Sequence, residues 1–131
     1  MTLSLEPLTQ HIGAVAHGLD LTRPLLAAEA TAIHQAMDQF AVLVIRGPII
    51  TGEQQLSFSR ALGTLEASTG TSLRKLSDYR LPTSFADVSN LDASNRPFAV
   101  DDRRRLFAIG NRLWHSDSSF KTTPAKYSIL H

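Results

Sequence analysis

The run AVLVIRG, from Ala41 to Gly47, is the feature that most constrains how this chain can fold. It is apolar and rich in β-branched residues, and a Gly-Pro pair closes it, so it predicts a buried strand. Segments with helical spacing lie on both sides of it. A strand enclosed in this way favours a domain in which helices and strands are mixed.

Two amphipathic helices are predicted beside this strand. In the segment Ala27–Phe40, apolar residues recur at helical spacing, namely Ala30, Ile33, Met37 and Phe40. The second helix spans Thr51–Leu62 and ends at Gly63. Thr51 is its predicted N-cap, and Gln54, three residues later, completes a capping box.

The remaining elements are predicted to be strands separated by irregular chain. One or two short strands are expected around Leu8–Ala16. The polar stretch Glu66–Arg105 is long for a plain connection, and only Phe85–Leu91 within it has strand character. Further strands are expected at Arg104–Ile109, Arg112–Ser116 and Lys126–Leu130. This order predicts one domain, either α+β or mainly β, with its helices on one side.

Composition excludes several classes of function. The 131 residues contain no cysteine, so disulfides, zinc–thiolate sites and thiol catalysis are excluded. A start without a basic leader, and no apolar run of roughly 20 residues, predict a cytoplasmic protein. Net charge is +1 with both signs interspersed, which does not indicate nucleic acid or a membrane as partner. The densest cluster, DDRRR at 101–105, is expected to be a solvated loop. A homo-oligomer stays possible.

The segment NRLWHSDSSF, residues 111–120, contains the candidate site. If it is a strand, His115 and Asp117 point to the same face, because alternate residues share a face. An imidazole and a carboxylate can converge on one cation, and two histidines with one carboxylate are the ligand set of non-haem Fe(II) oxygenases. Two alternatives stay open: a hydrogen-bonded histidine beside a surface acid, and a serine hydrolase using Ser116, Ser118 or Ser119. No nucleophile-elbow motif supports the hydrolase.

With its flanks, WHSDSSF resembles the metal motif of the taurine dioxygenase / 2,4-dichlorophenoxyacetate dioxygenase family. Similar stretches occur in the same order along the chain: IGAVAHGLDLTRPL, FAVLVIRGPIITGEQQLSFSRALGTLE, FADVSNLD and GNRLWHSDSSFKTTPAKYSIL. The last of them looks closer to the 2,4-dichlorophenoxyacetate branch. The family fold implied is the double-stranded β-helix, a relative of the jelly roll.

The resemblance also implies an activity. Family members use Fe(II), 2-oxoglutarate and O2, so we expect hydroxylation of a small carboxylate by the complete enzyme. The expected substrate is an aryloxyalkanoate such as 2,4-dichlorophenoxyacetate, whose ether would be cleaved. A taurine-type or alkylsulfate substrate is the alternative.

Carried over residue by residue, the resemblance assigns roles around the motif. His115 and Asp117 match the first two iron ligands. Asn111 matches a position that faces substrate. Phe120 matches an aromatic near the metal pocket, although simple core packing accounts for it equally well. Trp114 is expected to pack under the ligand strand. Ser118 and Ser119 are expected to orient the Asp117 carboxylate.

The family's other functional residues lie downstream of the matched region. They are the second metal histidine and the arginine and threonine that hold 2-oxoglutarate. We therefore expect residues 1–131 to be the N-terminal portion of a single dioxygenase domain, or a truncated, non-catalytic chain or interaction module. His131 is not expected to be the distal ligand. Lys75 or Arg74 is a candidate for the family's basic substrate contact. The other histidines are expected to be structural or exposed: His11, His17 and His34.

Overall fold

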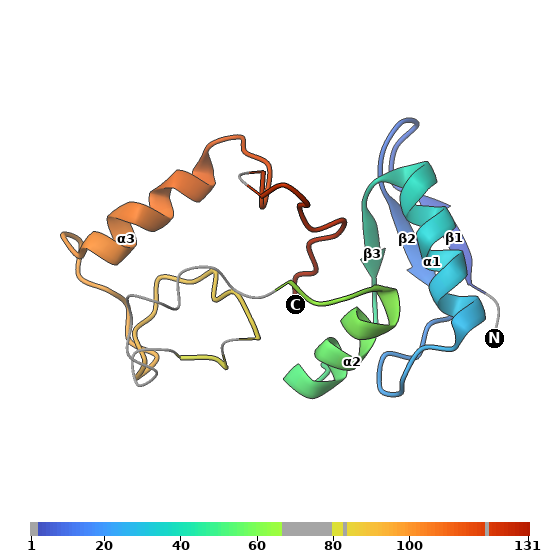
Figure 1. Cartoon of the computed structure of the whole chain (residues 1–131), viewed down its shortest axis with the longest axis horizontal. Coiled ribbons are helices and arrows are strands. Elements are labelled where there is room, and N and C mark those ends of the chain that lie inside the picture. The colour runs from blue at the N-terminus through green and yellow to red at the C-terminus, as the bar shows by residue number, and fades with distance from the viewer. Residues whose placement is uncertain (1–2, 67–79, 83, 120) are drawn as a thin grey trace. The chain divides into compact units, whose positions relative to one another are not determined.

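The computed structural model describes residues 3–66, 80–82, 84–119 and 121–131, and only the backbone of Phe107 and Asn111. Two compact units make up the chain, and they divide between Leu65 and Glu66 (Figure 1). The first unit contains the sheet and two helices, and the second contains the candidate site. No helix among the described residues is long and apolar enough to cross a membrane.

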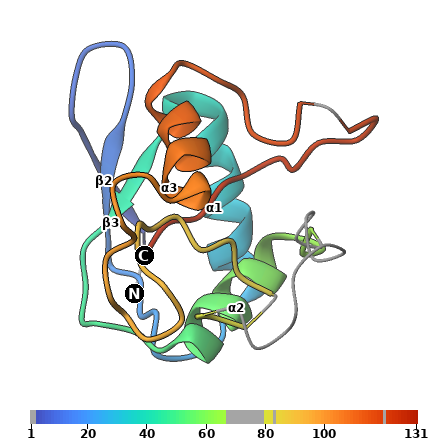
Figure 2. The same cartoon turned by 90° about the vertical axis from the view of Figure 1, so that its left-hand side faces the viewer.

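The first unit is built on a three-stranded sheet of order β1-β2-β3. Strands β1 (Ser4–Pro7) and β2 (Ala14–His17) form an antiparallel hairpin, whose turn projects past one end of the first helix (Figure 2). Strand β3 (Leu43–Ile45) pairs with β2 in parallel, with Val44 opposite Val15. Two parallel strands need a long crossover, and helix α1 (Ala27–Phe40) supplies it.

The hairpin turn explains where the N-terminal strand prediction was inaccurate. The Thr9 hydroxyl accepts from the backbone N–H groups of His11 and Ile12 and donates to the Ile12 carbonyl. Gly13 has φ +85°, a conformation that favours glycine, and its carbonyl accepts from the Leu8 N–H. Residues 8–13 therefore connect β1 and β2, so the one or two short strands expected around Leu8–Ala16 lie at the two ends of that range and not within residues 8–13.

Strand β2 lies at the centre of the first core. Ala14, Val15 and Ala16 are all buried, so both faces of the strand are covered. Helix α1 contributes Ile33 and Ala36 to the same core. The other buried apolar residues are Ile50 and, on helix α2 (Gly52–Leu62), Leu56 and Phe58. The predicted helices and a strand within Ala41–Gly47 are confirmed. The strand was expected to be buried, and this part is wrong, because Leu43 and Ile45 are only partly covered and Val44 is exposed.

The two helices of this unit begin with different caps. Helix α2 has the predicted capping box: Thr51 Oγ1 accepts from the Gln54 N–H at 3.2 Å, and Gln54 Oε1 accepts from the Thr51 N–H at 2.7 Å. Helix α1 has Leu26 at its N-cap, a residue without a side-chain acceptor. There the Glu29 carboxylate accepts from the Leu26 N–H at 2.8 Å.

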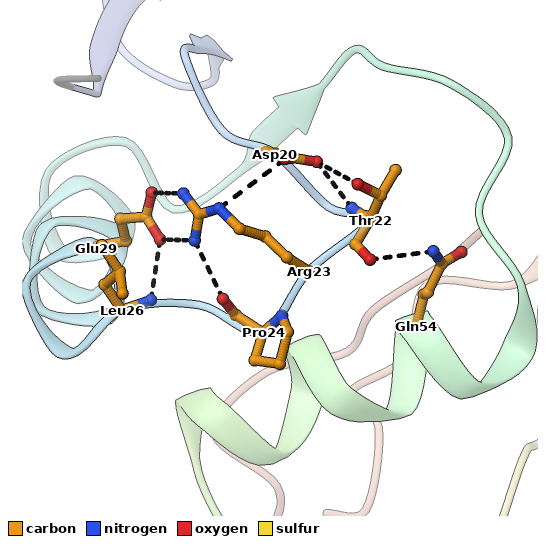
Figure 3. Close-up of polar contacts among 7 residues, drawn as sticks. All are labelled: Asp20, Thr22, Arg23, Pro24, Leu26, Glu29 and Gln54. Atoms are coloured by element: carbon orange, nitrogen blue, oxygen red, sulfur yellow. Dashed lines mark hydrogen bonds and ion pairs between the residues drawn. The ribbon is translucent and has the colours of Figure 1, made fainter.

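An ion pair ties the connection before α1 to that helix (Figure 3). The Arg23 guanidinium donates to both Glu29 oxygens, at 2.9 and 2.6 Å, in a bidentate pair. This arginine, and then the Leu26 amide, lower the pKa of Glu29 to about 2. On the same loop, the Thr22 carbonyl accepts from Gln54 Nε2 at 3.1 Å. Residues 22–29 are thereby held to the first turns of both helices.

The second unit contains a short helix where a strand was predicted. Helix α3 spans Arg103–Ala108 and continues as a 3₁₀ turn over Ile109–Arg112, so the strand expected at Arg104–Ile109 is wrong. Asp102 precedes the helix, and its carboxylate accepts from the Arg104 N–H at 2.8 Å, as an N-cap residue does. Part of the DDRRR cluster is thus a helix start and not a solvated loop.

Three other strand predictions in the second unit are also wrong. Phe85–Leu91 contributes only a single bridge, between Leu91 and Pro97. Arg112–Ser116 and Lys126–Leu130 contain no strand. A strand forms only where a neighbouring strand takes up its backbone hydrogen bonds, and the described part of this unit supplies none to these segments. The described residues therefore form one small sheet, and the double-stranded β-helix stays a prediction.

Candidate metal centre

The candidate ligands lie on a loop that begins where the 3₁₀ turn ends. Leu113 is extended, with φ −88° and ψ 152°, and a turn follows at residues 117–119. Ser118 has φ +54°, which a non-glycine residue rarely adopts, and its carbonyl accepts from the Lys121 N–H at 2.9 Å. The turn brings the side chains of His115 and Asp117 together without a strand: His115 Nε2 lies 3.3 Å from Asp117 Oδ1.

In each of the two side chains, the polar atom that does not face the other residue is held by a hydrogen bond. His115 Nδ1 lies 2.8 Å from the Leu113 carbonyl, and because a carbonyl only accepts, Nδ1 carries the proton. A neutral His115 ring then presents the lone pair of Nε2. Asp117 Oδ2 accepts from the Ser128 hydroxyl at 2.5 Å, which leaves Oδ1 facing the imidazole. Metal-binding histidines and carboxylates are commonly held in this way.

These two side chains fit a divalent cation. His115 Nε2 and Asp117 Oδ1 are both electron-rich, so a cation between them would stabilise their approach. That cation can be a proton on His115 or a metal ion. Donors about 2.1 Å from one ion and at a right angle would lie about 3 Å apart, close to the 3.3 Å between His115 Nε2 and Asp117 Oδ1. Both side chains are about half exposed, so an ion can reach them. One nitrogen and one oxygen suit a first-row metal such as Fe(II) or Mn(II).

The pair is not part of a larger cluster within the described residues. No group of three or more histidine, aspartate or glutamate side chains there could hold a metal ion. His17 instead contacts Glu6, with His17 Nε2 3.3 Å from Glu6 Oε2, and His11 is exposed. His34 lies on α1 and joins no such group either. A metal at the His115–Asp117 pair would need its remaining ligands from elsewhere.

The two serines predicted to orient the Asp117 carboxylate, Ser118 and Ser119, do not contact it. Ser118, expected to orient Asp117, instead contacts the Glu66 carboxylate, at 2.8 and 3.0 Å from its two oxygens. Within the described residues, Ser119 makes no hydrogen bond to Asp117. Ser128 makes that contact, and no spacing rule identifies a residue 11 positions downstream. No described serine contacts the His115 ring, so a serine–histidine relay is not assembled.

Other side chains were expected to lie around the ligand pair, and the structure describes only some of them. Trp114 was predicted to pack under the ligands, but it is fully exposed, so that prediction is wrong. Asn111 lies in the 3₁₀ turn, and its side chain is outside the described part. Phe120, Lys75 and Arg74 also lie outside the described residues. Substrate contacts by Asn111 and Phe120 stay predictions.

Comparison with known proteins identifies relatives along nearly the whole chain. The family described as "Taurine catabolism dioxygenase TauD, TfdA family" matches residues 4–131. An alpha-ketoglutarate-dependent 2,4-dichlorophenoxyacetate dioxygenase of Cupriavidus pinatubonensis is 33% identical over 130 residues, covering 99% of this chain and 45% of the relative. An (S)-phenoxypropionate/alpha-ketoglutarate-dioxygenase of Delftia acidovorans is 27% identical over 129 residues, covering 98% and 41%.

A solved structure agrees with these relatives. The crystal structure of AAD-2 in complex with Mn(II) and N-oxalylglycine superposes with a TM-score of 0.87 at 45% identity, over 96% of this chain and 44% of that one. The chain thus spans less than half the length of the relatives that it matches. The match over residues 4–131 shows that the chain belongs to the TauD/TfdA dioxygenase family.

Proposed function

We propose that this chain supplies the N-terminal part of an Fe(II)- and 2-oxoglutarate-dependent dioxygenase, and that His115 and Asp117 are two of its iron ligands. The observation that carries the proposal is the 3.3 Å approach of His115 Nε2 to Asp117 Oδ1. The Leu113 carbonyl holds His115 Nδ1, and the Ser128 hydroxyl holds Asp117 Oδ2. The names of the relatives support the co-substrate, since they are alpha-ketoglutarate-dependent dioxygenases. The Mn(II) and N-oxalylglycine bound to AAD-2 are stand-ins for Fe(II) and 2-oxoglutarate.

The chain's own residues would hold the metal and restrict its geometry. The Leu113 carbonyl keeps the proton on Nδ1 of His115, so Nε2 is available as a donor. Ser128 holds one oxygen of Asp117, so the other is presented to the ion. When bound there, Fe(II) would supply the activation of O2 that couples oxidation of 2-oxoglutarate to succinate and CO2 with hydroxylation of the substrate.

For the substrate we propose a small carboxylate of the aryloxyalkanoate class. In such a molecule one oxygen atom of O2 would enter the carbon beside the ether oxygen, and the other would enter succinate. The resulting hemiacetal collapses to a phenol and, from an aryloxyacetate, glyoxylate. Relatives named for 2,4-dichlorophenoxyacetate and for phenoxypropionate support this class over a sulfonate or an alkylsulfate. Asn111 and Phe120 are the proposed substrate contacts.

The test begins with the reading frame beyond the codon for His131. If the frame continues to a further histidine and an arginine, the longer product should form succinate from 2-oxoglutarate when 2,4-dichlorophenoxyacetate is added. His115→Ala and Asp117→Ala should each abolish that turnover, while His11→Ala, which alters an exposed histidine in the first unit, should leave it unchanged. Turnover that survives both ligand substitutions would show that the metal site is wrongly placed.

The 131-residue chain itself provides the second comparison. Because its described part offers two ligands, we expect weak metal binding and no substrate-stimulated succinate formation from it alone. Taurine and an alkylsulfate should be assayed beside the aryloxyalkanoates, and a preference for either would overturn the proposed substrate class. A frame that ends at residue 131, with no turnover, would favour the non-catalytic alternative.

A further inference from the structure

The residues after the ligand pair form a closed loop around a distant carboxylate. Asp117 and Ser128 are joined by their side chains, so the hydrogen bond closes residues 117–128 into a ring. Glu66, which lies 52 residues before Ser118, reaches into this loop. Its carboxylate contacts the Ser118 hydroxyl and forms an ion pair with Lys121.

The same loop affects the charge of Glu66 at a third position. The backbone of Ala125 also helps to lower the pKa of Glu66, more weakly than Lys121 and Ser118 do. Lys121 and Ser118 lower the pKa of Glu66, in that order, so the group is an anion at neutral pH. The Glu66 and Lys121 side chains are 29% and 24% exposed, so their ion pair is partly shielded but still reached by water. An ion pair of this kind contributes little to stability by itself, so its effect here is to fix the position of the loop together with the Ser118 contact.

The position of Ser118 connects this contact to the metal centre. Ser118 follows Asp117 directly and has φ +54°, a conformation that the backbone does not adopt without support. The Glu66 contact supplies that support from one side, and Ser128 fixes the Asp117 carboxylate from the other. The Glu66 and Ser128 side chains thus hold the segment that presents Asp117 Oδ1 from two positions.

We propose that Glu66 is a positioning residue for the metal centre: its carboxylate holds the 117–128 loop in the conformation that presents Asp117 Oδ1 beside His115 Nε2. The inference rests on the proposed function, because it assumes that this pair binds a divalent cation. The Glu66 carboxylate itself is engaged by Ser118 and Lys121, so it is not proposed as a metal ligand. Its removal should weaken metal binding without removing either donor.

The experiment titrates Co(II) into the 131-residue chain and follows the visible absorption of the bound ion. Glu66→Gln keeps the size of the side chain but loses the ion pair with Lys121, and we expect about tenfold weaker Co(II) binding. Ser118→Ala, which breaks the same contact from the loop side, should weaken binding in the same direction. Ser119→Ala is the matched control, since this neighbouring serine does not contact Glu66, and it should bind like the wild type.

The outcomes distinguish failure of the Glu66 proposal from failure of the proposed metal site. Wild-type binding that is lost in His115→Ala but unchanged in both Glu66→Gln and Ser118→Ala would overturn the role of Glu66 and leave the metal site standing. Co(II) binding that His115→Ala and Asp117→Ala leave unchanged would overturn the metal site itself. Thermal unfolding of every variant checks that weaker binding occurs in a folded chain. If Glu66→Gln does not fold, Ser118→Ala and Lys121→Met carry the test.

Discussion

Removal of the Ser128 hydroxyl measures how much its hydrogen bond to Asp117 contributes to metal binding. In the structure, Ser128 Oγ lies 2.5 Å from Asp117 Oδ2, the length of a charge-assisted O–H···O⁻ bond. Loss of such a partner to a metal ligand typically weakens metal binding 10- to 100-fold. The Asp117 side chain is 59% exposed, so water can take the place of the hydroxyl. We therefore expect Ser128→Ala to weaken binding by about tenfold, the lower end of that range.

The assay is a titration of the chain with Mn(II), in which the free ion is measured by electron paramagnetic resonance. Ser116→Ala serves as the matched control, since Ser116 is exposed and makes no side-chain contact with Asp117. The thermal midpoint of Ser128→Ala should stay close to that of the wild type, because the lost bond lies at the surface. If Ser128→Ala binds Mn(II) as tightly as the wild type while His115→Ala does not, the hydrogen bond has no part in preparing the site.

Three further predictions concern the first unit. Ile33→Ala should lower the free energy of unfolding by about 3 kcal/mol in urea titrations, because it leaves a cavity at a buried core position. Thr51→Ala should cost about 1 kcal/mol in the same measurement, since the N-cap acceptor of α2 is lost, and a cost near zero would refute the capping role. Glu29 has its pKa lowered from 4.5 to about 2, so its charged form stabilises the fold above pH 4.5 and this contribution is lost as pH falls toward 2. Arg23→Met should weaken that acid dependence when thermal midpoints are compared across this range, and an unchanged profile would count against the ion pair.

Local signals were sufficient for most of the first unit. The spacing of Ile33 and Met37 identified α1, and Thr51 with Gln54 identified the start of α2, because periodicity and capping act within a few residues. The strand inside Ala41–Gly47 was also found from its composition. The cap of α1 is equally local but does not follow the usual pattern: Leu26 has no side-chain acceptor, and its N–H donates to the Glu29 carboxylate three residues on.

The second unit shows where such signals fail. Strand character at Arg112–Ser116 did not produce a strand, because pairing depends on a partner far along the chain. His115 and Asp117 could be identified as candidate ligands from their spacing and from the family resemblance, although a turn, not a strand, brings them together. Ser128 and Glu66 could not be predicted, since only the folded loop places them near residues that are 11 and 52 positions away.

Ser118 satisfies two requirements that favour different amino acids. Its φ of +54° is a conformation that glycine adopts at little cost, so the backbone alone would select glycine there. The contact with Glu66 needs a hydroxyl, which glycine does not have. Ser118→Gly would remove the cost of the positive φ and would also remove the contact with Glu66. The stability of the turn should therefore rise while the metal affinity of the neighbouring pair falls.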